Sequence, residues 1–215
     1  GLMIKKLFLL SLTYCIISCQ TKPTASLADG SVIWNIDSKA QITDKVKDST
    51  SSVSLDIFLK KNESIRIEVT ATLGYQVGSL LMTRSSLQYA IHPQKYFIQG
   101  PFAGRTLKPL FKQEIDPLIL WSIIHDESLQ KRGFQCVPAG TLIENCKNEF
   151  ATVQIEQRGE LGPNGRSADG QKKITLENGH IKMVWIFKSR EASDVSQNET
   201  FVLVRPKEYK LITIK

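Results

Sequence analysis

Among the side chains that can serve as nucleophiles, bases or metal ligands, this 215-residue sequence has four cysteines and three histidines. His92, His125 and His180 are isolated, whereas structural zinc sites group four cysteine or histidine ligands at short spacings. The sequence has neither the glycine-flanked serine of a nucleophile elbow nor a glycine-rich phosphate-binding motif. We therefore predict no metal site, no cofactor and no enzyme activity, although a catalytic triad is recognised by geometry rather than by sequence.

The first two cysteines lie in an N-terminal segment with the layout of an export signal. Lys5 and Lys6 precede an apolar run over 7–17, which is too short to span a bilayer as a helix. The stretch 16–19, Ile-Ile-Ser-Cys, resembles the lipobox of bacterial lipoproteins. That resemblance implies cleavage between Ser18 and Cys19 and attachment of lipid to Cys19. An ordinary secretory signal with a coincidental cysteine is the alternative.

This interpretation divides the chain into three parts. Residues 1–18 are a lipoprotein signal peptide, residues 19–30 a polar tether, and residues 31–215 a single domain with its own core. Gln20 stands where an aspartate would resemble the inner-membrane retention signal of enterobacteria. We therefore expect a lipid-anchored protein on the periplasmic face of the outer membrane, with the inner membrane as the alternative.

Cys136 and Cys146 remain after the signal is removed and Cys19 is lipidated, and nine residues separate them. In an oxidising periplasm two cysteines this close are expected to form a disulfide. Redox-active pairs usually have two residues between the cysteines, so a structural role is favoured.

The charge of the chain is positive but dispersed. The formal net charge is +7, and removal of the two lysines of the signal leaves +5. The basic residues do not cluster, which argues against nucleic-acid binding. A mild attraction to anionic lipid headgroups and a merely solvated basic surface both remain open.

Alternation of apolar and polar residues with period two dominates the rest of the sequence and predicts strands with one buried face. Asn178-Gly179 is a strong hairpin signal, and 60–63 is another expected turn. Residues 158–172 and 189–199 are expected loops. Short turns between sequential strands predict an antiparallel meander. The expected strands cover 33–42, 53–59, 65–69, 75–83, 87–92, 96–99, 153–157, 174–176, 181–187, 201–204 and 211–214.

Residues 105–131 break this pattern and predict two short helices. Thr106 is a candidate cap for the first, and Asp116 with Pro117 is a typical helix start for the second. The second helix is apolar on nearly all sides, whereas a surface helix needs only one apolar stripe. We expect it to be covered on several faces or to face something apolar that is not protein. Its candidate lid or cavity residues are Leu118, Leu120, Trp121 and Ile124.

The order of these elements resembles the LolA/LolB family of lipoprotein carriers and receptors. Three segments carry the resemblance: the hairpin 65–83 with Leu73-Gly74, the helical region 107–129, and the hairpin 174–185. It implies a mainly β (α+β) fold, an unclosed antiparallel barrel of about 10–11 strands with a short helical lid over an apolar cavity. The disulfide loop, the loop 158–172 and the C-terminal extension depart from the family.

The resemblance also implies a function without enzymatic chemistry. The protein would be a monomeric, membrane-anchored chaperone that takes the acyl chains of lipoproteins from a LolA-like carrier and inserts the lipoproteins into the membrane. Leu73, Gly74 and Tyr75 would form the membrane-insertion loop, with Thr72 where the family has a proline. Alternatively, Leu73 folds back into the core and Trp121 only packs a helix on a sheet. Other functions for the same fold are a lipid or glycolipid carrier, an envelope sensor that reads lipid, or a purely structural lipoprotein.

Overall fold

A computed structural model describes residues 32–111, 113–195 and 197–215, so the predicted signal peptide and Cys19 lie outside the described residues. In the described residues twelve strands form one sheet, in the order β12-β6-β5-β4-β3-β2-β1-β11-β10-β9-β8-β7. All neighbours are antiparallel except β12, which lies parallel to β6. The strands are β1 (Ile33–Asp44), β2 (Ser49–Lys60), β3 (Ser64–Ala71), β4 (Gln76–Thr83), β5 (Ser86–Ile91), β6 (Tyr96–Pro101), β7 (Gln135–Ala139), β8 (Ile143–Lys147), β9 (Thr152–Gln157), β10 (Lys172–Glu177), β11 (Ile181–Ser193) and β12 (Lys210–Thr213).

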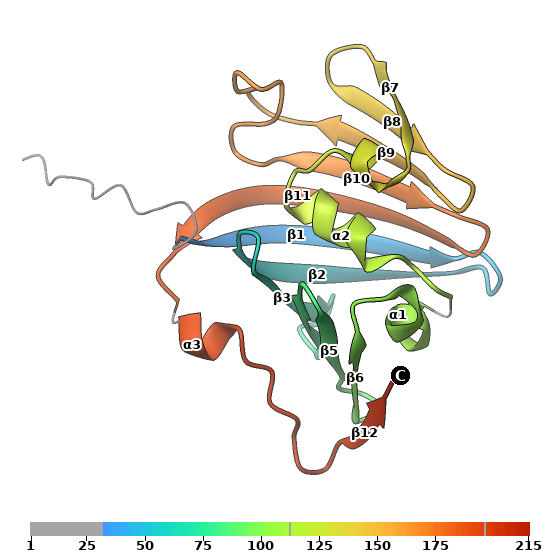
Figure 1. The fold of residues 1–215 in the computed structure, drawn as a ribbon, viewed down its shortest axis with the longest axis vertical. Helices are drawn as coiled ribbons and strands as arrows, with labels where there is room; N and C mark the ends of the chain where they lie inside the picture. The colour runs from blue at the N-terminus through green and yellow to red at the C-terminus, as the bar shows by residue number, and fades with distance from the viewer. Residues whose placement is uncertain (1–31, 112, 196) are drawn as a thin grey trace, which may run out of the picture.

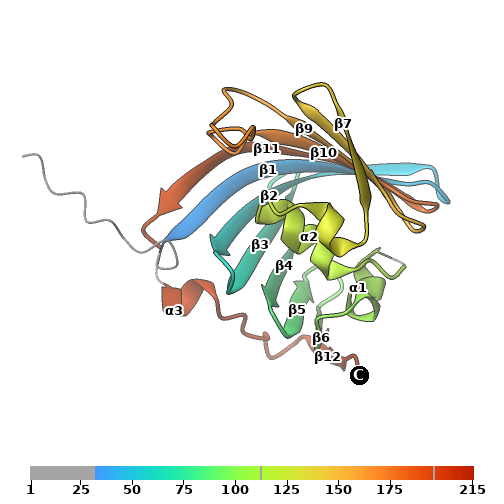
Figure 2. The same ribbon diagram turned by 45° about the horizontal axis from the view of Figure 1, so that its top comes forward.

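The sheet curls strongly without closing, and helices occupy its concave side (Figures 1 and 2). These helices connect β6 to β7 and are α1 (Gly104–Phe111), α2 (Pro117–Ile124) and the 3-10 helix η1 (Leu129–Arg132). The predicted unclosed antiparallel sheet with a helical lid is confirmed. It has twelve strands in the described residues, slightly more than the expected 10–11.

Period-two alternation sorts each strand into a concave and a convex face. On β3, Ile65 and Ile67 are buried toward the helices, while Arg66 and Glu68 face the other way. A strand with this pattern can only lie with its apolar row against a cover, because one step of register would expose the whole row. The cover is mainly α2, whose Leu120, Trp121 and Ile124 belong to the same buried cluster as the strands.

Helix α2 begins where the sequence predicts. The carboxylate of Asp116 accepts a hydrogen bond of 2.9 Å from the backbone N–H of Leu118, and Pro117 opens the helix, where its missing N–H costs nothing. The prediction for Thr106 was wrong, because α1 already begins at Gly104. The hydroxyl of Thr106 instead donates to the carbonyl of Pro101, which ties α1 to the end of β6.

Three further expectations differ from the structure. Residues 201–204, predicted as a strand, are not one. Strand β11 continues to Ser193, into the loop expected over 189–199, because β1 pairs with β11 along its full length. Strands β7 and β8 were not predicted, because the hairpin around 140–142 lies at the open edge of the sheet and has little apolar alternation.

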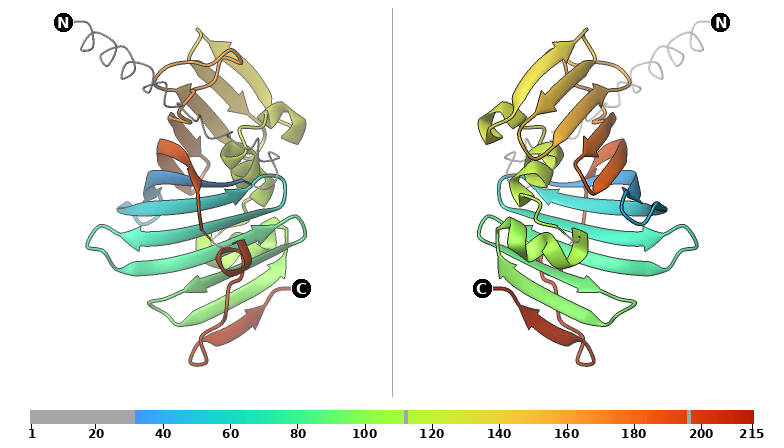
Figure 3. Two further views of the ribbon diagram at one scale, coloured as in Figure 1. Left: turned by 90° about the vertical axis from the view of Figure 1, so that its left-hand side faces the viewer. Right: turned by 90° about the vertical axis from the view of Figure 1, so that its right-hand side faces the viewer.

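The C-terminal segment crosses the convex face of the sheet before β12 joins the edge strand β6 (Figure 3, left). The short helix α3 (Gln197–Thr200) precedes this crossing. Arg66 donates to the carbonyl of Val202, and the side chains of His92 and Tyr209 are 2.7 Å apart, from Nδ1 to the hydroxyl. Helices α1, α2 and η1 therefore cover the concave face (Figure 3, right), and the C-terminal segment covers the opposite face.

Candidate functional site

An apolar cavity of about 510 Å³ lies between the concave face of the sheet and the helices. Its volume is within the range of about 300–1,000 Å³ typical of small-molecule sites. Toward one end of the strands the lining becomes polar, with Asp44, Lys47 and Gln94 among the residues there. The apolar wall comes from β1 to β5 and β11, through Ala40, Ile42, Val53, Leu55, Ile67, Val69, Val77, Leu80, Ile91, Ile181, Met183 and Trp185.

The helices close the cavity with a few side chains only. Leu110 and Phe111 of α1 and Leu120 of α2 contribute to its lining. Of the four predicted lid residues, Leu120 alone lines the cavity. Trp121 instead stacks on His125, with ring centroids 4.4 Å apart, and meets Phe102 edge to face.

The remaining two lid candidates have other positions. Ile124 is fully buried in the core, and Leu118 is half-buried outside the cavity lining. The nearly all-round apolarity of α2 is explained because the sheet and the adjoining segments cover most of its surface, with seven of its eight residues buried.

A charged cluster fixes the C-terminal end of α2 to the sheet. The buried ammonium of Lys172, at the start of β10, donates to the carbonyl of Ile123 and forms an ion pair with Asp126. Arg190 of β11 pairs with the other carboxylate oxygen at 3.1 Å, and Arg166 lies 3.9 Å from the first. Burial lowers the pKa of Lys172, an effect that the nearby Asp126 carboxylate opposes.

His125 forms a second link at the same end of α2. Its Nε2 accepts a 3.0 Å hydrogen bond from the backbone N–H of Asn62, in the turn between β2 and β3. An N–H donor at Nε2 requires that nitrogen to be unprotonated, so Nδ1 carries the proton and donates to the carbonyl of Trp121 at 2.9 Å. Burial lowers the pKa of His125, opposed in part by this bond to Trp121. The neutral ring therefore connects the helix to the sheet.

The N-terminal end of α2 lies at the opposite end of the strands. A second cavity of about 640 Å³ separates it from the turns that follow β8 and β10. Asp116 and Ile119 line one side of this cavity, and Phe150 and His180 the other. Helix α2 is therefore fastened at one end and adjoins open space at the other.

Leu73, Gly74 and Tyr75 form the tight turn between β3 and β4. The backbone N–H of Gly74 donates to the carbonyl of Ala71, and a φ of 85° makes glycine the favoured residue there. Leu73 is 82 % exposed and Tyr75 68 % exposed. Leu73 does not fold back into the core, and the turn lies at the end of the strands where the cavity lining becomes polar.

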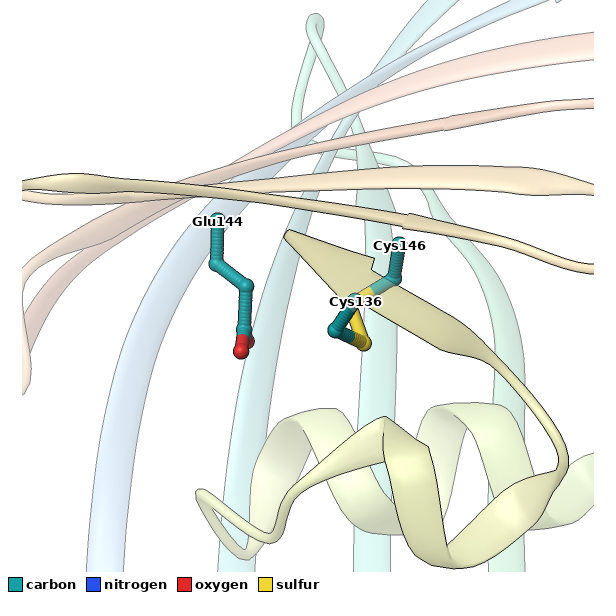
Figure 4. Close-up of side chains that lie close together, drawn as sticks. All are labelled: Cys136, Glu144 and Cys146. Carbon is teal, nitrogen blue, oxygen red and sulfur yellow. A yellow bond between two sulfur atoms is a disulfide. The ribbon is translucent and has the colours of Figure 1, made fainter. Parts of the chain in front are cut away.

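The predicted disulfide joins Cys136 and Cys146, which lie directly opposite each other on β7 and β8 (Figure 4). Glu144 is close to both sulfur atoms, and this trio has ligand atoms near enough to surround a cation. With the sulfurs bonded to each other, only the carboxylate has a charge to offer a metal. The disulfide therefore holds the hairpin at the open edge of the sheet.

A polar cluster on the convex face brings a serine and a histidine together. Ser79 Oγ is 3.1 Å from His92 Nε2 and donates to Glu68 at 2.5 Å. Glu68 alternates along β3 with residues that line the cavity, so the cluster faces away from it. With Tyr209 bonded to the far side of His92, the cluster holds the C-terminal segment in place.

A curved, unclosed antiparallel sheet with an apolar cavity beneath two helices defines this chain as a half-barrel with the kind of cavity that takes apolar ligands. None of the helices in the described part of the chain has the length and apolar content that a membrane crossing needs. No protein-family model matches the sequence, and no curated protein matches it.

Three solved structures are similar in architecture. A conserved uncharacterised protein from Thermus thermophilus is 8% identical, with a TM-score of 0.44 over 86% of this chain and 93% of that one. A LolA superfamily protein from Nitrosomonas europaea is 7% identical, with a TM-score of 0.43 over 78% and 89%. An outer membrane lipoprotein-sorting protein domain from Vibrio parahaemolyticus is 5% identical, with a TM-score of 0.43 over 80% and 90%. At identities of 5–8% and TM-scores of 0.43–0.44, these structures do not assign a function to this chain.

Proposed function

We propose that this chain is an outer-membrane lipoprotein, anchored at Cys19, that receives lipoproteins and inserts them by taking their acyl chains into its cavity. The observation that carries the proposal is the apolar cavity of about 510 Å³ beneath the helical lid. A fully packed barrel would leave no place for an acyl chain, and the sheet and helices leave such a place. The proposed work is binding and release, without a covalent step by the chain.

Magnitudes support a protein of this kind. Each buried methylene stabilises by about 0.8 kcal/mol, so a chain of roughly 15 methylenes resists transfer into water by about 12 kcal/mol. A lipoprotein crossing the periplasm therefore needs apolar surface at every stage. A cavity of 510 Å³ offers that surface to about one chain with the lid in place, so a cargo with several chains needs the lid to move.

The exposed turn at Leu73 has a role in this proposal. A leucine held in water at 82 % exposure is favourable to bury in the apolar region of a bilayer, where its transfer contributes about 1.5–3 kcal/mol. Leu73 would enter the target membrane, with Gly74 shaping the turn and Tyr75 at the interface between lipid and water.

The direct test begins with mass spectrometry of whatever copurifies with the anchored chain, for which we expect acylated molecules. A labelled lipoprotein loaded on a LolA-like carrier is then offered to the chain, and transfer is followed by pull-down. Leu73→Glu is expected to accept the lipoprotein but not to deliver it to membranes. Leu142→Glu is the control, because Leu142 is also exposed but lies in the turn after β7, at the other end of the strands. Retention on the carrier by the wild-type chain would exclude the receptor function.

A lipid or glycolipid carrier is the second candidate, and the same cavity favours it. Its signature would be a copurified lipid without a protein portion, together with no transfer from the carrier. The Leu73 test does not separate these two functions, because both deliver to a membrane, so the pull-down decides between them.

A further inference from the structure

The most exposed apolar side chains gather at one end of the half-barrel. In the described residues, five large apolar side chains are more than two-thirds exposed, and four of them lie in turns at the cavity end of the strands. Val46 is 74 % and Phe150 75 % exposed, in the turns after β1 and β8, and Leu73 and Tyr75 belong to the turn after β3. The register of β1 to β3 and of β8 to β11 places all three turns at the same end. We call Val46, Leu73, Tyr75 and Phe150 the apolar rim.

Local hydrogen bonds hold two of these side chains outward. The carboxylate of Asp44 accepts hydrogen bonds from the backbone N–H groups of Val46 and Lys47. The side chain of Asn148 accepts those of Phe150 and Ala151 in the same way. Such turns satisfy the backbone within themselves. The backbone hydrogen bonds of these two turns therefore fix Val46 and Phe150 in exposed positions.

The turns at the other end of the strands have a different character. Lys61 and Asn62 form the turn after β2, and Arg84 and Ser85 the turn after β4. Arg84 also donates to the carbonyl of Asn62, which joins these two turns by a polar contact. In the described residues the turns at this end include Leu142, which is 43 % exposed, but none of the five side chains that are more than two-thirds exposed. Solubility alone does not account for this unequal distribution of the most exposed apolar tips.

The chain outside the described residues is long enough to let the rim meet a membrane. The strand β1 begins at the far end from the rim, and its twelve residues span about 40 Å. The residues between Cys19 and Ile33 can reach about 45–50 Å when extended. A lipid on Cys19 and the apolar rim can therefore contact the same bilayer when the tether lies along the sheet. This step rests on the lipid anchor proposed above.

We propose that the apolar rim is a bilayer-docking surface, in which Val46 and Phe150 enter the lipid interface beside Leu73 and seat the polar end of the cavity on the membrane. Three separate turns define a plane, whereas a single inserted leucine would leave the barrel free to tilt. Docking of this kind places the polar end of the cavity against the lipid headgroups, so an acyl chain can pass between cavity and bilayer with little exposure to water.

The test uses a chain that begins at residue 20, which lacks the anchor but keeps every described strand and helix. Its partitioning onto vesicles of phosphatidylethanolamine and phosphatidylglycerol is measured by sedimentation at low and high salt. We expect Val46→Ser and Phe150→Ser each to weaken partitioning at least about fivefold, at both salt concentrations. Val204→Ser is the matched control, because Val204 is 75 % exposed but lies on the C-terminal segment, and it should leave partitioning unchanged.

A fluorescent fatty acid read in the same samples separates this proposal from the proposed cavity function. Rim variants should bind it as the wild type does, because Val46 and Phe150 do not line the apolar cavity of about 510 Å³. Loss of vesicle binding together with loss of fatty-acid binding would mean damage to the fold and would overturn the assignment of the rim. Equal effects of Val46→Ser and Val204→Ser, or binding that disappears at high salt, would also overturn it. Concentration-dependent dimers that Val46→Ser abolishes would assign the rim to a second copy of the chain instead.

Discussion

The substitution Val69→Phe tests directly whether the size of the cavity limits the length of the acyl chain that it binds. Val69 lies on β3 opposite Gly78 of β4, and both line the cavity. Because Val69 is only half-buried, a larger side chain at this position can extend into the cavity instead of displacing the core. Phenylalanine brings about four more carbon atoms than valine, and these would occupy the place of three or so methylenes of a bound chain.

The magnitude follows from the area lost to the ligand. In the wild type, affinity should rise with each added methylene by up to about 0.8 kcal/mol, or about fourfold, until the cavity is full. The variant should reach its plateau about three methylenes earlier. Its affinity for the longest chains should therefore fall by about 2–3 kcal/mol, or roughly 30- to 150-fold, with the shortest chains little affected.

The assay is displacement of a fluorescent fatty acid by saturated fatty acids from octanoyl to stearoyl, below their micelle concentrations. Val204→Phe is the control, because it adds the same atoms on the convex side of the sheet. An equal loss at every chain length would show that Val69→Phe damages the fold. Affinity that does not depend on chain length in the wild type would refute acyl binding in this cavity.

Three further predictions concern the links that hold the lid and the sheet edge. Burial lowers the pKa of His125, so as the pH falls below about 6.5 the unfolded chain takes up a proton that the folded chain resists. The free energy of unfolding of the wild type should therefore decrease as the pH falls below about 6.5. Urea titrations at several pH values should show that His125→Gln removes this part of the pH dependence. Asp126→Asn should lower the free energy of unfolding by about 3 kcal/mol, because it leaves Lys172 buried without its carboxylate. Lys172→Met removes the buried charge and should lower it by less. Thermal melts that show the reverse order would contradict this account. Reduction of the Cys136–Cys146 disulfide should lower the free energy of unfolding by about 3 kcal/mol and speed hydrogen exchange in β7 and β8. Fatty-acid binding should stay unchanged, because neither strand lines the apolar cavity of about 510 Å³.

The strands of the meander could be predicted from the sequence because their signal is local. Alternation along 65–69 places Ile65 and Ile67 on the buried face, and Asn178-Gly179 marks the turn between β10 and β11. The start of α2 was predicted for the same reason, because Asp116 and Pro117 satisfy their own helix end. These residues act on neighbours within a few positions.

The contacts that fasten the lid could not be predicted in this way. Lys172 meets Asp126 across 46 positions, and Asn62 meets His125 across 63. Nothing near Lys172 in the sequence distinguishes it from the exposed lysines. The division of α2 into Leu120, which lines the cavity, and Trp121, which packs away from it, also depends on how the sheet curls around a helix that is apolar on most sides.

The position of these contacts determines how the lid can open. The ion pair of Lys172 with Asp126 and the hydrogen bond of Asn62 to His125 both lie at the C-terminal end of α2, far from the apolar rim. At the rim end, Asp116 caps its own helix, and the cavity of about 640 Å³ leaves space between α2 and the turn that bears Phe150. A helix held at one end moves most at the other. Opening should therefore widen the cavity at the rim, where a chain would leave the bilayer, while the distant charged cluster stays in place as the hinge.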